Sequence, residues 1–75
     1  MGMIYRLQTA IAVFELRQEP LGMWDLWVDG TPTLTFPSPE EAAQAVAGKD
    51  SGYSVWDNDE SEAPADLSSW EQVEE

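Results

Sequence analysis

The chain has 75 residues and carries fifteen acidic against three basic side chains, a formal net charge of −12 at pH 7. A chain of this length holds one small domain, and its charge argues against direct binding to nucleic acid or to an anionic membrane. The sequence contains neither cysteine nor histidine, which excludes disulfides and thiolate metal sites and removes the commonest general base. We therefore expect no enzyme, no cofactor and no metal site.

The first six residues, MGMIYR, lack an apolar run of the length that a signal peptide or a membrane span needs. This predicts a cytoplasmic protein without membrane contact. A core this small depends on aromatic side chains or on a partner subunit. We expect that partner to be another protein or a second copy of the chain, as in a homodimer.

The first half of the chain predicts strands. The linkers between them are turn signals: residues 19–22 contain Pro and Gly, and Asp29-Gly30 is typical of a tight hairpin. Pro32 and Pro37 suit a short or edge strand. Three segments rich in β-branched and aromatic residues are the predicted strands: 9–17, 23–29 and 31–37.

A helix boundary follows these strands. Ser38 is in place as N-cap, Pro39 occupies the first helical position and Glu41 the third, which together form a capping box. The Ala-rich residues 39–47 then predict a helix, and Gly48 is a natural stop.

These elements predict an α+β fold for residues 1–56. Residues 53–56, YSVW, are expected to add a short strand, giving a three- to four-stranded antiparallel sheet with one helix packed on one face, in the order β-β-β-α-β. Residues 57–75 carry eight acids and no base and predict an acidic tail or linker. Within this tail, residues 67–75 predict a short amphipathic helix, because apolar side chains recur at helical spacing at Leu67, Trp70 and Val73.

Side-chain alternation places the two tryptophans of the second strand on opposite faces. Trp24 falls on the face that the helix is expected to cover, together with Phe14, Leu16, Leu26, Leu34 and Phe36 from the strands and Ala42, Ala43 and Val46 from the helix. Trp27 falls on the other face, which no predicted helix covers.

The uncovered face is expected to be partly apolar, because Ile11 and Val13 share it with Trp27. Exposed apolar patches commonly mark interaction surfaces. Three occupants of this face are open: the Leu67–Val73 segment folding back, a second copy, or a different protein.

Two function classes fit these observations. The first is a small acidic interaction module or assembly factor that binds through this aromatic sheet face. Its candidate contact residues are Trp27, Ile11, Val13, Leu67, Trp70 and Val73. The alternative is an acidic mimic of nucleic acid that inhibits a basic nucleic-acid-binding protein. Residues 1–56 hold only seven acids against three bases, whereas a mimic needs its charge on a rigid surface, so the mimic ranks second.

The acidic run also has partial calcium-loop spacing. Asp57, Asp59 and Ser61 match the first three ligand positions of an EF-hand loop. Position six is Glu62 instead of glycine, and position twelve is Ser68 instead of glutamate. We interpret the run as a solvated linker.

Residues 23–47 resemble modules that combine a three-stranded sheet with a helix, such as the AP2-like DNA-binding domains. In those domains a strand ending in Phe precedes a Ser- or Thr-capped EEAA helix, as FPSPEEAA does here. The resemblance implies the sheet-plus-helix shape. DNA-reading members carry Arg and Lys on the sheet, where this chain has Asp25, Trp27 and Asp29, so neither their DNA binding nor their contact residues are transferred.

Overall fold

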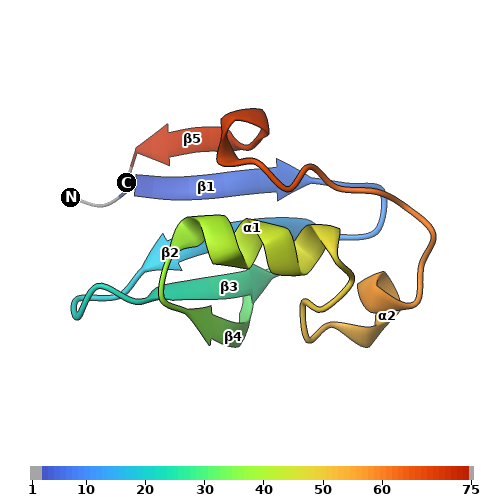
Figure 1. The fold of residues 1–75 in the computed structure, drawn as a ribbon, viewed down its shortest axis with the longest axis horizontal. Coiled ribbons are helices and arrows are strands. Elements are labelled where there is room, and N and C mark those ends of the chain that lie inside the picture. The colour runs from blue at the N-terminus through green and yellow to red at the C-terminus, as the bar shows by residue number, and fades with distance from the viewer. Residues whose placement is uncertain (1–2, 75) are drawn as a thin grey trace.

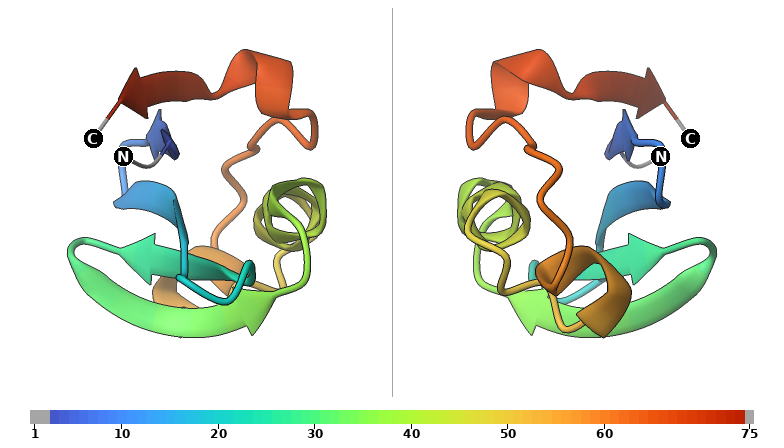
Figure 2. Two further views of the ribbon diagram at one scale, coloured as in Figure 1. Left: turned by 90° about the vertical axis from the view of Figure 1, so that its left-hand side faces the viewer. Right: turned by 90° about the vertical axis from the view of Figure 1, so that its right-hand side faces the viewer.

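The computed structural model describes residues 3–74 and forms a curved antiparallel sheet with a helix on its concave side (Figures 1 and 2). The strand order is β4-β3-β2-β1-β5. The strands are β1 (Met3–Gln8), β2 (Val13–Gln18), β3 (Trp24–Val28), β4 (Thr31–Phe36) and β5 (Glu71–Glu74). The helical elements are α1 (Pro39–Ala47), α2 (Ser54–Asp57) and a 3-10 turn, η1 (Leu67–Ser69). The predicted α+β class, an antiparallel sheet with one main helix on it, is confirmed.

The local signals around α1 act as predicted. The Ser38 hydroxyl accepts a hydrogen bond from the Glu41 backbone N–H at 3.3 Å, which satisfies one of the free donors of the first turn. In the β3–β4 hairpin, Asp29 and Gly30 have φ values of 50° and 85°. This left-handed pair is what a two-residue hairpin turn requires. Within residues 3–74, no helix has the length and apolar character to cross a membrane.

The sheet has two strands that the sequence did not predict. β1 carries Arg6 near its centre, and this charged residue interrupts the apolar residues that would otherwise have predicted a strand. β5 pairs antiparallel with β1, with Val73 opposite Ile4, and brings the acidic C-terminal segment into the sheet (Figure 1). The predicted helix at 67–75 is therefore corrected to a 3-10 turn followed by a strand, because pairing with β1 satisfies the backbone of residues 71–74.

Residues 53–56, predicted as a strand, form α2 instead. The Asp57 carboxylate accepts hydrogen bonds from the backbone N–H groups of Ser51 and Gly52 at 3.0 and 3.2 Å, and from the Ser51 hydroxyl at 2.7 Å. The Ser51 hydroxyl in turn accepts from the Tyr53 N–H at 3.2 Å. These local side-chain bonds close the loop into a helical turn, in competition with an extended strand.

The concave face of the sheet carries the core that alternation predicted. Leu26, Leu16 and Tyr5 lie opposite one another across β3, β2 and β1. Leu34 continues this row on the edge strand β4 and remains 41% exposed. The small side chains of α1 let the helix pack closely on the sheet, and three of them are fully buried: Ala42, Ala43 and Val46.

Two further tryptophans complete the core. Trp56 of α2 is fully buried, and its ring meets that of Phe14 edge-to-face with the centroids 5.1 Å apart. Its Nε1 donates to the Val46 carbonyl at 2.8 Å. Trp70 is 3% exposed and donates from Nε1 to the Pro64 carbonyl at 3.1 Å. The segment after Asp57 thus contributes to the same core.

Candidate functional site

The convex face of the sheet turns away from α1, and the strand register arranges its side chains in rows. We call it the outer face. One complete row crosses all five strands from β4 to β5: Pro32, Trp27, Glu15, Arg6 and Glu71. The neighbouring complete row is Thr35, Asp25, Arg17, Ile4 and Val73. On the other side of the Trp27 row, Val13 lies opposite Gln8.

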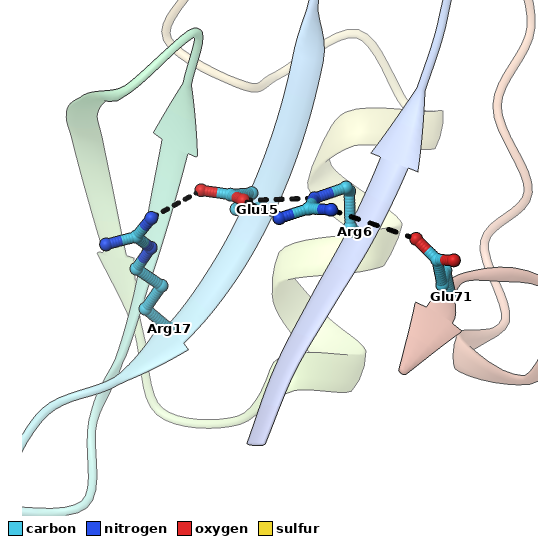
Figure 3. A network of polar contacts seen from close by, with 4 residues as sticks. All are labelled: Arg6, Glu15, Arg17 and Glu71. Carbon is cyan, nitrogen blue, oxygen red and sulfur yellow. Dashed lines mark hydrogen bonds and ion pairs between the residues drawn. The ribbon is translucent and has the colours of Figure 1, made fainter. Parts of the chain in front are cut away.

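An ion network runs along these rows (Figure 3). Arg6 donates from Nε and Nη2 to one oxygen of Glu15, at 3.1 and 2.9 Å, and Arg17 donates from Nη2 to the other oxygen at 2.7 Å. A longer contact of 4.0 Å joins Arg6 to Glu71. The Glu15 side chain is only 11% exposed, so its charge is compensated by direct partners instead of by water.

The environment of Glu15 favours its ionised form. Burial by itself raises the pKa of this carboxyl group. The hydrogen bonds and positive charges of Arg17 and Arg6 outweigh burial and hold the Glu15 pKa below its ordinary value of 4.5.

We therefore expect the Glu15 network to stabilise the fold at neutral pH and to lose this contribution in acid. Because the folded-state pKa lies below the unfolded value, the contribution is complete above about pH 4.5 and fades as pH falls through the folded-state pKa. Glu15→Gln removes the charge at nearly constant shape. Both arginines are over one third exposed, so we expect a loss of only about 1 kcal/mol at pH 7.

Urea unfolding of both proteins from pH 7 to pH 3 measures this effect. The free-energy gap between wild type and Glu15→Gln should shrink toward pH 3. Glu62→Gln, at an exposed position in the acidic segment, is the matched control and should show no such gap. A gap of equal size at both ends of the range would contradict the electrostatic origin.

The ring of Trp27 is covered by the side chain of Arg17. The Arg17 guanidinium is 4.6 Å from the centroid of the Trp27 ring, a cation–π contact. Within residues 3–74, the Trp27 Nε1 and the Arg17 Nε are buried without a hydrogen-bond acceptor. The partly apolar face is thus a mixed surface, in which half-buried apolar side chains alternate with paired charges.

The six predicted contact residues divide between the two faces. Val13, Trp27 and Val73 lie on the outer face. Ile11 is in the turn before β2 and packs on the core, because the Thr9 hydroxyl accepts from the Ile11 N–H at 3.2 Å and bends the chain there. Trp70 is buried in the core and Leu67 packs against it. The three-residue spacing of Leu67, Trp70 and Val73 does not place them on one surface here.

Sequence reasoning missed Ile4 and the arginine–glutamate network as parts of the outer face. Glu15 and Arg17 stand two apart in a predicted strand, which assigns them to one face. Arg6 and Ile4 could not be added, since the first strand was not predicted. The opposite charges of Glu15 and Arg17 on one face of β2 were the signal in the sequence that could have indicated an ion network.

The charges of the molecule are unevenly distributed. Lys49, the third basic residue, has its Nζ 3.6 Å from the centroid of the Trp56 ring on the helix side. Residues 38–69, which fill the concave side and its surroundings (Figure 1), contain eight acids and this single base. The two complete rows of the outer face contain two arginines and three carboxylates. These two rows are therefore nearly neutral, with a net charge of −1, whereas residues 38–69 carry a net charge of −7.

Several other carboxylates are engaged in local contacts. A hydrogen bond shared with Asp25 raises the pKa of Glu19. Hydrogen bonds from Ser61 lower the pKa of Asp59, and those from Ser68 and Ser69 lower that of Asp66. Among the described residues, no group of three or more acidic side chains is placed to hold a metal ion.

The outer face thus combines one half-buried tryptophan, flanking aliphatic side chains and an ion network. Comparison with protein-family models, with curated proteins and with solved structures finds no match to the chain.

Proposed function

We propose that this chain is a small, non-catalytic protein-interaction module that works in the cytoplasm and binds through the outer face around Trp27. One observation carries the proposal: α1 lies on the concave side of the sheet, and no helix of residues 3–74 lies over the convex side (Figure 2). That open side presents Trp27 and Val13, both half-buried, and its two complete rows of side chains have a net charge of only −1. Tryptophan provides a large contact area at small entropic cost, which makes it a frequent centre of binding energy.

Trp27→Ala should weaken partner binding at least ~10-fold with little change in fold, because the side chain is only half-buried and packs on the surface of the sheet. The measurement is capture of partner proteins from a lysate by tagged wild type and variant, followed by titration of the purified partner. Gln44→Ala, at an exposed position of α1, is the matched control on the helix side. Equal binding by wild type and Trp27→Ala would refute the proposal.

A second candidate, the acidic mimic of nucleic acid, is supported by the way the acidic segment is held. Asp57 is fixed by the Ser51 and Gly52 amides, and Trp70 anchors the end of the segment in the core. The acids of this segment are therefore attached to a folded body, as a mimic requires. The test is competition: binding to a basic partner should be lost on adding duplex DNA or salt, and binding that persists in both would reject this candidate.

A further inference from the structure

We infer that the occupant of the outer face is a second copy of this chain, which would form a two-fold symmetric dimer through its sheets. The inference rests on the proposed function, because it names the partner of the same surface. It follows from the distribution of charge, from the order of charges along the rows and from two donors that lack acceptors.

The distribution of charge decides where two copies can meet. Each copy carries a net charge of −12, so two copies repel each other over most of their surface. The outer face is the exception, since Arg6 and Arg17 both lie on it and offset two of the three carboxylates of its complete rows. Contact through the helix side would instead bring together two segments with eight acids and one base each.

The order of charges on this face is self-complementary. Along the network, charges alternate in sign from Glu71 through Arg6 and Glu15 to Arg17 (Figure 3). A two-fold axis that lies in the plane between the two faces, perpendicular to this series, turns the faces toward each other and reverses the direction of the series in the second copy. A negative end then lies over a positive end, so Glu71 of each copy can approach Arg17 of the other.

Two buried donors point to the same contact. The Arg17 Nε and the Trp27 Nε1 lack acceptors within the described part of the chain, and a donor in this state loses its hydrogen bond to water without replacement. Arg17 is 37% exposed and lies over the Trp27 ring. A small movement of Arg17 toward a carboxylate of the second copy would give its Nε an acceptor. The same movement would uncover the Trp27 ring for contact with that copy.

The curvature of the sheet limits the strength of this contact. The outer face is convex (Figure 2), so two copies meet mainly over the central strands β3, β2 and β1. Small interfaces of this kind give weak and reversible complexes. We therefore expect a dimer with a Kd of roughly 10⁻⁴ M.

Salt gives this dimer a distinctive signature. Added salt weakens the Glu71–Arg17 pairs between the copies, but exposed pairs of this kind contribute little. It also screens the larger repulsion between two bodies that each carry a net charge of −12, while the contact of Trp27 with the second copy remains. Self-association should therefore strengthen as salt rises. Binding of a basic foreign protein would weaken under the same change.

Sedimentation and light scattering of the full chain, from about 10 µM to about 1 mM, provide the test. The expected result is a weight-average mass that rises from 8.4 kDa toward twice that value, with more dimer at about 0.5 M than at about 0.05 M NaCl. A mass of 8.4 kDa throughout, at both salt concentrations, would overturn the inference. A dimer that dissociates on adding salt would overturn it as well.

Three variants locate the contact. Gln8→Glu adds one charge at an exposed position on the outer face, and Gln44→Glu adds the same charge on α1. We expect the first to raise the dimer Kd several-fold and the second to leave it unchanged. Trp27→Ala should raise it at least ~10-fold. Equal effects of the two glutamine variants would place the contact elsewhere and reject this assignment.

The two proposals fail in different ways. A chain that remains a monomer, yet binds a purified foreign protein in a Trp27-dependent manner, rejects the second copy and keeps the interaction module. A monomer whose binding to other proteins is indifferent to Trp27→Ala rejects both.

Discussion

Trp56→Ala should destabilise the protein by about 3–5 kcal/mol, the range for removing a large aromatic side chain from a core. Trp56 is fully buried against Phe14, and its indole N–H is bonded to the Val46 carbonyl at 2.8 Å. The variant loses this packing and leaves a carbonyl without its donor. A domain of this size has a total stability of only about 4–11 kcal/mol, so the variant should lose a large part of it and unfold at a much lower urea concentration.

Urea titration followed by far-ultraviolet circular dichroism measures this loss. Trp27→Ala is the matched control, the same substitution at a half-buried position of the outer face, and should cost no more than about 1 kcal/mol. Trp56→Phe keeps most of the ring contact and removes the N–H donor, so its loss should be intermediate, about 1–3 kcal/mol. A Trp56→Ala protein as stable as the Trp27→Ala protein would show that α2 is not part of the core.

Trp70→Ala should have the second largest effect, about 3 kcal/mol, and should release β5 from the sheet. Trp70 is 3% exposed and stands directly before Glu71, the first residue of β5. Its N–H bond to the Pro64 carbonyl also fixes the acidic segment. Without this anchor, the four-residue strand keeps only its pairing with β1, which is marginal for so short an edge strand.

Hydrogen exchange detects the release of β5 separately from global unfolding. Amides of residues 71–74 and of the facing edge of β1 should lose protection in Trp70→Ala before the amides of β2 and β3 do. Val73→Ala, also in β5 but on the outer face, should cost about 1 kcal/mol or less. Unchanged stability and unchanged exchange in Trp70→Ala would mean that residues 57–75 are independent of the domain.

The elements that sequence reasoning recovered are those specified by local chemistry. The Ser38 cap and the Asp29-Gly30 turn each depend on neighbouring residues alone, and both form as expected. Alternation along β3 correctly separated Trp24 from Trp27. Each of these signals is contained within a few positions of the chain.

The C-terminal strand β5, which was missed, depends on contacts between distant residues. β5 exists because Glu71–Glu74 pairs with Met3–Arg6 across almost the whole chain, and no local pattern reports such a partner. The helical spacing of Leu67, Trp70 and Val73 was misleading for the same reason. Of the candidate site, Trp27 and Val13 could be placed from alternation, whereas Ile4 and Arg6 required the register of an unpredicted strand.

The pairing of the first strand with the last has a consequence for synthesis of the protein. While the ribosome is still making residues before Glu71, the outer edge of β1 has no neighbour and the core lacks Trp70. The nascent chain can form the β2–β3–β4 meander and α1 early, since their contacts are local, but the slow step joins positions far apart in sequence. Until β5 has been synthesised, the free edge of β1 is therefore exposed. At this stage, pairing of β1 with other chains competes with its pairing with β5.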